Sequence, residues 1–155
     1  MKPTTTSWGG VAEWYDDMLK NDGDSFQRNV ILPNLIRIIE PKKGMTLLDL
    51  ACGQGYFSRA FAQNGANVTG YDISKELVTL AKEQEAKKQS ASGLSKEGKN
   101  ETPPIQFHVS PADSVPFIQD KSVDVVTVIL ALQNIENLQG VFNEASRVLK
   151  SGGKI

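Results

Sequence analysis

The apolar positions of the chain follow two different periods, and these alternate along much of its length. Four runs are mostly apolar or β-branched, as in strands that are buried on both faces of a parallel sheet: residues 45–50, 67–72, 105–109 and 123–130. Three other stretches repeat apolar residues at helical spacing: residues 56–63, 75 to 82 and beyond, and 138–149. This alternation of strand and helix predicts a doubly wound α/β sheet with right-handed crossovers.

A helical pattern also precedes the first predicted strand. Residues 11–20 have the spacing of a short amphipathic helix, and a second helix with one apolar stripe ends at Ile39. Asp24 or Ser25 can cap the second helix, and Pro33 is expected to bend or divide it. The N-terminal part of the chain is therefore predicted to be helical.

Turn residues and polar stretches suggest where the chain is divided. The Pro-Lys-Lys-Gly turn at residues 41–44 separates an N-terminal helical cap segment, residues 1–43, from a sheet domain over residues 44–155. Within that domain, residues 85–104 are rich in Lys, Ser, Gly, Glu and Asn and have almost no apolar anchors. Such a segment cannot offset the entropy of ordering, so a mobile insertion is expected there.

Composition narrows the range of functions. The 155 residues contain 17 Lys and Arg against 18 Asp and Glu, so no strong field is available to attract nucleic acid or an anionic membrane. Cys52 is the only cysteine, which excludes an intrachain disulfide and a multi-cysteine metal site and favours a cytoplasmic location. We interpret it as a small, partly buried residue. No export signal or long apolar span is visible in the sequence.

Acidic residues and glycines gather where the first two predicted strands end. Asp49 lies near the tip of the first strand, shortly before Gly53 and Gly55, which open the next helix. Glycines there permit positive φ and remove the β-carbons that would hold a ligand away from the backbone. Asp72 ends the second strand, where its carboxylate can accept hydrogen bonds from both hydroxyls of a ribose. Open α/β sheets bind their ligands at this edge.

Five segments carry further patterns: residues 47–55, 70–74, 112–117, 122–135 and 147–153. In this order they resemble the motifs of class I S-adenosylmethionine-dependent methyltransferases. Each motif alone has many false matches, whereas five in order are specific. The resemblance implies a Rossmann-like methyltransferase sheet with strand order 3-2-1-4 and the start of a fifth strand, preceded by N-terminal helices.

The resemblance also implies S-adenosyl-L-methionine as the cofactor and no metal. The implied cofactor-binding residues are Asp49, Ala51, Gly53, Gln54 and Gly55 at the methionine end, Asp72 at the ribose, Ile73, Ala112 and Asp113 at the adenine, and Leu130 and Gln133 beside the transferred methyl group. Small-molecule methyltransferases also cover this pocket with aromatic residues of an N-terminal helix, which makes Trp14 and Tyr15 the candidates for a lid. No catalytic residue is assigned, and Gln133 and Tyr15 are the candidates.

The chain departs from the family pattern at two points. Pro111 stands where an acidic residue often precedes the alanine, and Gln133 and Asn134 stand where many relatives have histidines. A histidine base after the fourth strand is thereby excluded. Methyl transfer is an in-line displacement at an activated carbon, so positioning and exclusion of water can supply most of the acceleration.

Simpler structural interpretations stay open for several of these residues. Asp113 is equally well a turn residue, and Gln133 an ordinary loop residue. Trp14 and Tyr15 also fit plain packing of an amphipathic helix. His108, the only histidine, is expected on an edge strand without a catalytic role.

Three functions are weighed, and the first is methyl transfer to a small-molecule acceptor of unspecified identity. An NAD(P)-dependent oxidoreductase is disfavoured, because the third glycine of its fingerprint falls at Ser58 and Asp49 would repel a diphosphate. A non-catalytic or truncated S-adenosylmethionine-binding module stays open, because the chain is expected to stop at the fifth strand and to leave the fourth without a neighbour on one side. The sequence does not indicate an oligomeric state.

Overall fold

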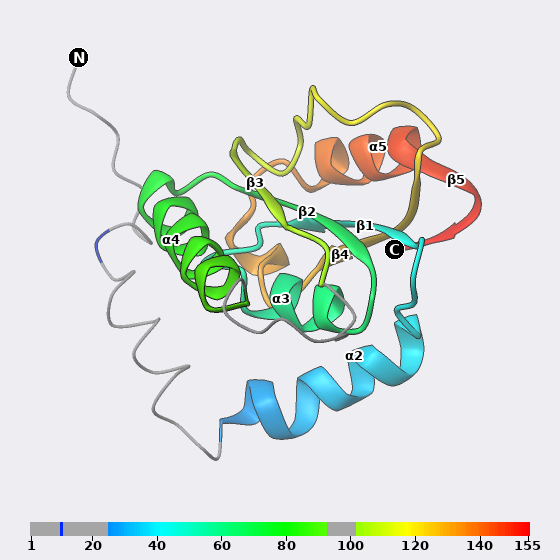
Figure 1. Cartoon of the computed structure of the whole chain (residues 1–155). Helices are drawn as coiled ribbons and strands as arrows, with labels where there is room; N and C mark the ends of the chain where they lie inside the picture. Colours follow the sequence, from blue (N-terminus) through cyan, green and yellow to red (C-terminus); the bar gives the residue numbers. More distant parts are fainter. Residues whose placement is uncertain (1–9, 11–24, 93–101) are drawn as a thin grey trace.

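Helices cover both faces of one parallel sheet in the computed structural model, which describes residues 10, 25–92 and 102–155 (Figure 1). Within these ranges the strand order is β3-β2-β1-β4-β5, and every neighbouring pair is parallel. The strands are β1 (Thr46–Leu50), β2 (Asn67–Asp72), β3 (Gln106–Val109), β4 (Val123–Val128) and β5 (Leu149–Lys154). The predicted doubly wound, Rossmann-like sheet is confirmed.

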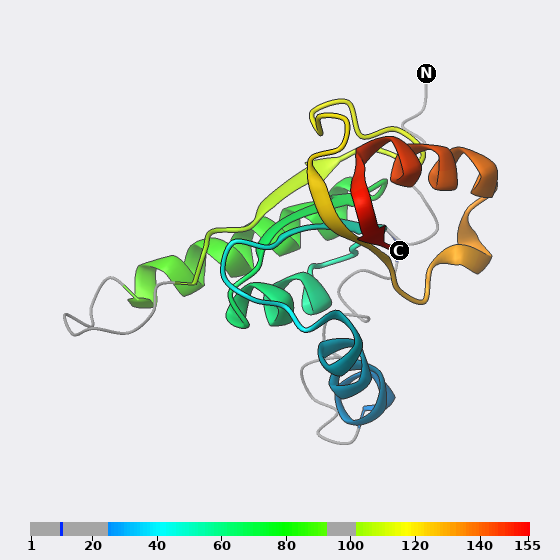
Figure 2. The same ribbon diagram turned by 90° about the vertical axis from the view of Figure 1, so that its right-hand side faces the viewer.

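The helical elements connect these strands as the periodicity predicts. They are η2 (Gln27–Ile31), α2 (Leu32–Ile39), α3 (Tyr56–Gln63), α4 (Lys75–Ser92), η3 (Leu132–Asn134) and α5 (Leu138–Val148). Figure 2 shows α2 and α3 on one side of the sheet and α5 on the other. No helix in the described ranges combines the length and the apolar character needed to cross a bilayer.

Alternate residues of the central strands point to opposite faces of the sheet and fill two separate cores. Leu47 belongs to the core beneath α3, together with the fully buried Phe61. Its neighbour Leu48 belongs to the core beneath α5, together with Val141. Because side chains alternate along a strand, Asp49 lies on the α3 side of the sheet, next to the start of that helix.

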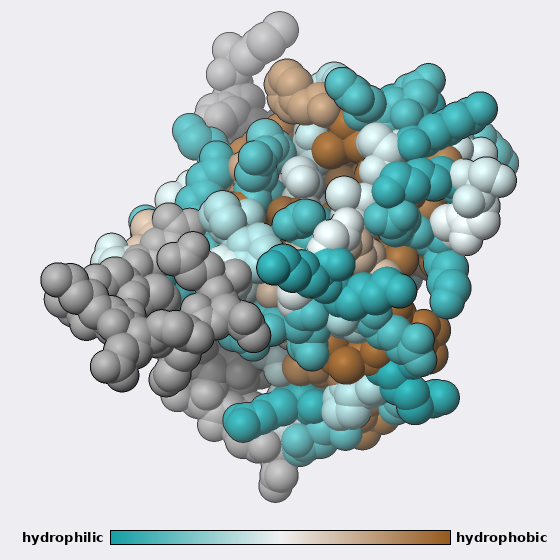
Figure 3. All heavy atoms as spheres, turned by 45° about the vertical axis from the view of Figure 1, so that its right-hand side comes forward, coloured by the Kyte–Doolittle hydropathy of each residue, from teal (hydrophilic) through white to brown (hydrophobic). Residues whose placement is uncertain are grey.

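The surface of the protein combines hydrophilic side chains with separate apolar areas (Figure 3). The face shown in Figure 3 is hydrophilic over most of its area, and separate apolar areas lie between the hydrophilic side chains. Two of the exposed large apolar residues, Ile73 and Leu130, follow β2 and β4 at the carboxyl-terminal edge of the sheet. This is the edge at which the sequence analysis places the ligand.

The helical segment before β1 changes from π-helical to α-helical between Ile31 and Leu32 without leaving helical backbone angles, so the bend or division expected at Pro33 stays a prediction. A π-helical turn, η2, comes first, and Pro33 then lies in the first turn of α2, where a missing N–H is least harmful. The Ser25 hydroxyl accepts a hydrogen bond from the backbone N–H of Arg28 at 3.3 Å. The helix predicted over residues 11–20 lies outside the described residues, and the division between residues 43 and 44 stays a prediction.

The helix α4 is longer than the sequence analysis expected. It continues to Ser92, so the expectation of a mobile insertion from Glu85 is wrong for residues 85–92. These residues are mostly good helix formers, and the buried Glu85 carboxylate accepts the backbone N–H of Ile105 at 3.4 Å. Residues 93–101 lie outside the described part of the chain.

The strand β5 corrects two further expectations. The helix α5 ends at Val148, before the predicted bound, and Leu149 already has extended backbone angles. From there β5 pairs with β4, with an irregularity in the register between Val123 and Val125, so β4 has a neighbour on both sides. The positive φ of Gly152, 79°, allows the chain to bend within this strand.

A cluster of polar groups joins the amino-terminal ends of β1 and β4 to β5. One carboxylate oxygen of Asp124 accepts both the backbone N–H and the hydroxyl of Thr46, each at 2.8 Å. Its other oxygen accepts the Lys150 ammonium at 2.8 Å. These bonds, the one from Lys150 first, lower the pKa of Asp124 from 3.8 to about 2.

We predict that Asp124→Ala lowers the free energy of unfolding by about 2 kcal/mol, because it removes charge-assisted bonds to Thr46. Lys150→Ala is the matched control and should lose less than about 1 kcal/mol, since only an exposed ion pair is removed. The Asp124 contribution should be complete above the unfolded pKa of 3.8 and be lost as the pH falls toward 2. Urea unfolding at several pH values measures both effects, and equal losses in the two variants would contradict this explanation.

Candidate functional site

The carboxylate of Asp49 is buried at the end of β1. Only 2% of the residue is exposed, and each carboxylate oxygen has one hydroxyl partner. The Ser58 hydroxyl, from α3, donates to Oδ2 at 2.5 Å, and the Thr127 hydroxyl, from β4, donates to Oδ1 at 2.8 Å. Burial raises the pKa of Asp49 from 3.8 to about 6, while the two hydroxyl donors act in the opposite direction.

The two glycines of the turn after β1 serve different purposes. Gly53 has a φ of 57°, and a β-carbon built on it would meet none of the described residues within 4 Å, so this position is open in the described part of the chain. Gly55 has a φ of 80°, and its β-carbon would lie 2.6 Å from Cζ of Phe107 on β3. Gly53 therefore leaves room for a ligand, whereas Gly55 leaves room for packing inside the protein.

Arg59 fixes the residue between these two glycines. Its guanidinium donates to the backbone carbonyl of Gln54 at 2.7 Å and also to the side-chain oxygen of Gln54. Gln54 is only 2% exposed. The turn is thus held from the first turn of α3 and does not depend on a bound ligand for its shape.

Asp72 ends β2 and lies across the same turn. Its Oδ2 accepts the backbone N–H of Gly53 and its Oδ1 accepts that of Ser74, both at 2.8 Å. Burial raises its pKa above 3.8, and these two backbone donors counteract the rise. Each oxygen has accepted one of these bonds and can accept another, which suits a pair of neighbouring hydroxyls.

Two neighbouring cavities lie beside these carboxylates. The Asp49 cavity, about 40 Å³, is lined by Asp49, Ala51, Cys52, Gly53, Gln54, Tyr56, Phe57 and Ile129. The Asp72 cavity, about 120 Å³, is lined by Ala51, Gly53, Asp72, Ile73, Leu77, Ile129, Leu130, Ala131, Asn134 and Ile135. They share Ala51, Gly53 and Ile129, so the two cavities are neighbours.

Two non-glycine residues at this site have a left-handed backbone. Ala51 follows β1 and Leu130 lies just beyond β4, and both have a φ of 54°. This conformation costs about 1 kcal/mol or more for a residue with a β-carbon. Both residues line the Asp72 cavity, so the strained backbone shapes its wall.

Four of the predicted cofactor residues do not line either cavity: Gly55, Ala112, Asp113 and Gln133. Asp113 accepts a hydrogen bond at 2.6 Å from Nδ2 of Asn137, the residue whose side chain caps α5. The Gln133 side chain is exposed and donates to the backbone carbonyl of Leu130 at 2.8 Å. Their contact with a cofactor stays a prediction, and that of Trp14 and Tyr15 lies outside the described residues.

The loop that carries Ala112 and Asp113 is held in place from α5. Arg147 donates to the backbone carbonyls of Val115 and Ile118 and to the carboxylates of Asp120 and Glu144. These carboxylates raise the pKa of the Arg147 guanidinium above its ordinary value. A fixed loop at this place can form one side of a binding site.

Sequence reasoning missed a group of cavity residues: Tyr56, Phe57, Leu77, Ile129, Ala131, Asn134 and Ile135. Several of them directly follow β1 or β4 in the chain, and the rule that ligands lie at the carboxyl ends of parallel strands could have found these. Cys52 also lines the Asp49 cavity, and burial raises the pKa of its thiol well above the ordinary value. His108 is on the edge strand β3, as expected, and stacks on Tyr71 at 4.9 Å between ring centroids.

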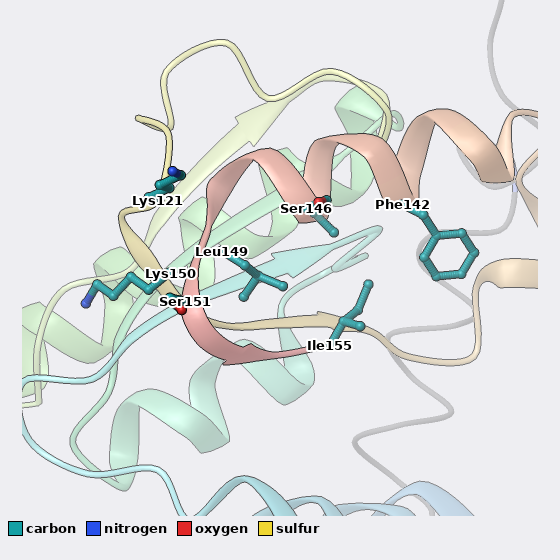
Figure 4. Close-up of a pocket in the computed structure, with 8 residues that line it drawn as sticks. Lys121, Phe142, Ser146, Leu149, Lys150, Ser151 and Ile155 are labelled. Atoms are coloured by element: carbon teal, nitrogen blue, oxygen red, sulfur yellow. The ribbon is translucent and has the colours of Figure 1, made fainter.

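A larger hollow lies apart from this site, between α5 and β5 (Figure 4). It measures about 510 Å³ and is lined by Lys121, Phe142, Ala145, Ser146, Leu149, Lys150, Ser151 and Ile155. It shares no lining residue with the two cavities and contains no carboxylate. Among the described residues, no three His, Cys, Asp or Glu side chains come together in a way that could hold a metal ion.

A comparison with protein families decides how this site is to be understood. The family described as "Methyltransferase domain" matches residues 48–155, more than two thirds of the chain, and these residues include both carboxylates and the glycine turn. The chain belongs to the class I S-adenosylmethionine-dependent methyltransferases.

Individual relatives of the chain agree with that assignment. It is 33% identical over 112 residues to the demethylmenaquinone methyltransferase of Tropheryma whipplei (strain Twist), covering 72% of this chain and 40% of that protein. It is 30% identical over 149 residues to the malonyl-[acyl-carrier protein] O-methyltransferase of Pectobacterium atrosepticum, covering 96% of this chain and 49% of that protein. The chain thus spans about half, or less, of the length of these relatives.

A solved structure shares the fold of this chain. The crystal structure of an S-adenosylmethionine-dependent methyltransferase from Aquifex aeolicus has a TM-score of 0.67 at 20% identity, and the match covers 87% of this chain and 66% of that chain. The arrangement of strands and helices described above is therefore an arrangement of this family.

The two turn glycines should respond differently to substitution. Gly53→Ala introduces only a left-handed alanine and should destabilise the protein by roughly 1–2 kcal/mol. Gly55→Ala adds a clash with Phe107 and should cost about 1–3 kcal/mol more. Thermal or urea unfolding measures both losses, and a Gly53 variant that is the less stable of the two would contradict the roles assigned here.

Proposed function

We propose that the protein of which this chain is part transfers a methyl group from S-adenosyl-L-methionine to a small-molecule acceptor. The observation that carries this proposal is the pair of buried carboxylates, Asp49 and Asp72, at the ends of adjacent parallel strands. They lie on either side of Gly53, whose position is open in the described part of the chain. The carboxylate of Asp49, the turn at Gly53, which has no side chain, and the carboxylate of Asp72 thus follow one another along the two neighbouring cavities.

The described residues fit this cofactor chemically. Asp49, which lines the smaller cavity, supplies the negative charge suited to an ammonium and a sulfonium. Asp72 has free acceptor capacity on both oxygens for the two hydroxyls of a ribose. Ile73 and Leu77, which line the larger cavity, offer apolar surface to the flat adenine ring. When bound, S-adenosylmethionine supplies a methyl carbon that is already activated by positive sulfur.

The protein's own part in the reaction is positioning and exclusion of water. Ala51 and Leu130, which both have a left-handed backbone, shape the wall of the Asp72 cavity. In-line displacement at an activated carbon gains most from such alignment. Gln133, a candidate for a catalytic role, bonds the Leu130 carbonyl, and Tyr15, the other candidate, lies outside the described residues. We therefore assign no general base.

A small-molecule acceptor is supported by the balanced charge of the chain and by the relative that is named for demethylmenaquinone. The relatives named above are methyltransferases for demethylmenaquinone and for malonyl-[acyl-carrier protein], which differ in chemistry. The proposal therefore leaves the acceptor atom open among oxygen, nitrogen, sulfur and carbon. The cytoplasm is the compartment we propose, because a single cysteine suits a reducing environment.

Dinucleotide binding is the rival that the site disfavours. A dinucleotide fold has a third glycine where this chain has Ser58, and the Ser58 hydroxyl is fully buried against the Asp49 carboxylate. A diphosphate at the turn would meet the negative charge of Asp49. Asp49, which suits a cationic ligand end, thus opposes an anionic one, whereas Asp72 suits a ribose in either ligand.

We predict that the chain binds S-adenosylmethionine and S-adenosylhomocysteine and does not bind NADH, as measured by titration calorimetry. Asp72→Asn should weaken both adenosyl ligands, and adenosine as well, by about 10-fold or more, because an acceptor oxygen is replaced by an NH2 donor. Asp120→Asn, at an exposed carboxylate paired with Arg147, is the matched control and should leave all affinities unchanged. Undiminished affinity in the Asp72 variant, or tight binding of NADH, would refute the proposed function.

A further inference from the structure

Asp49 has no cationic partner among the described residues, although its carboxylate is buried. Arg59, the basic side chain of α3, donates hydrogen bonds to the backbone and side-chain oxygens of Gln54. The ionisable groups that face Asp49 are Asp72 from β2 and Cys52 from its own turn, and the charge of Asp72 disfavours ionisation of Asp49. What favours the Asp49 anion are two neutral hydroxyls, those of Ser58 and Thr127.

These two hydroxyls come from separate elements and are aimed at separate oxygens. Thr127 lies directly opposite Asp49 in the register of β1 and β4, so both side chains are on the same face of the sheet. Ser58 is in the first turn of α3 and is fully buried. A helical serine often bonds the carbonyl four residues earlier, but here the Gln54 carbonyl accepts Arg59 and the Ser58 hydroxyl turns to Asp49.

We infer that Ser58 and Thr127 are positioning residues that hold Asp49 in its charged form and aim it at the Asp49 cavity, so that the affinity for a cationic ligand end there depends on both hydroxyls. This inference rests on the proposed function and deepens it. It assigns a role to two residues that touch no ligand themselves. It also explains why a serine stands at the point where a dinucleotide-binding turn has a glycine.

The inference implies that affinity for a cationic ligand depends on pH in a definite direction. Because burial raises the pKa of Asp49 to about 6, the carboxylate gains its charge as the pH rises through that value, and affinity rises with it. Both hydroxyl donors lower this pKa, so removing either should move the transition to higher pH. The expected displacement is about one pH unit for each hydroxyl, the size of one hydrogen bond to a charged group.

The test compares Thr127→Val with Thr127→Ser, and Ser58→Ala with the wild type. The Asp49 carboxyl is titrated in the free protein by infrared spectroscopy, with Asp49→Asn identifying its signal. Affinities for S-adenosylmethionine and for adenosine, which lacks the cationic methionine part, are measured by calorimetry between pH 5 and pH 9. Thermal unfolding confirms that each variant is folded.

The hydroxyl-free variants should titrate about one pH unit above the wild type, and Thr127→Ser should restore the wild-type value. At pH 6 they should lose about five-fold in affinity for S-adenosylmethionine, at pH 7 about two-fold, and by pH 8 they should approach the wild type, while they bind adenosine as the wild type does at every pH. An unchanged carboxyl titration in both variants, or an equal loss for adenosine, would overturn the inference while leaving the proposed function intact. A wild type that binds no S-adenosylmethionine at any pH would overturn both.

Discussion

The site depends on one electrostatic constraint, which is that a carboxylate without a cationic partner among the described residues is buried at the end of the central strand. Such a group is costly to ionise unless hydrogen bonds replace the lost water. In this protein Ser58 and Thr127 provide those bonds, one to each oxygen of Asp49. The arrangement leaves a negative charge that is poorly compensated, beside a cavity large enough for part of a ligand. A cationic group in that cavity would balance the negative charge of Asp49, which no described side chain of the protein balances.

The parallel sheet is what brings the other parts of the site to this carboxylate. In a parallel sheet all strands end at the same edge, so Asp72 and the residues after β4 arrive next to Asp49 although they are distant in sequence. The Gly53 N–H donates to Asp72, which joins the turn after β1 to the tip of β2. The backbone geometry of the sheet and of the turn therefore determines where the few charged side chains of the site lie.

Much of this arrangement could be predicted from sequence, because the signals are local. The helix over residues 56–63 follows from periodicity, and the two acids follow from their position at strand ends. The role of Gly55 could not be predicted, since its missing β-carbon makes room for Phe107 from another strand. The bond between Asp113 and Asn137 also joins two loops whose proximity is set by the fold. Local pattern identifies residue types, and only tertiary structure shows what they touch.

The most direct test is a crystal structure of the chain with S-adenosylhomocysteine. The account predicts the ribose hydroxyls on Asp72, the backbone of Gly53 against the ligand, and the amino group of the amino-acid portion in the Asp49 cavity. A ligand bound elsewhere, for example in the hollow between α5 and β5, or bound in the reverse direction with adenine beside Asp49, would contradict it.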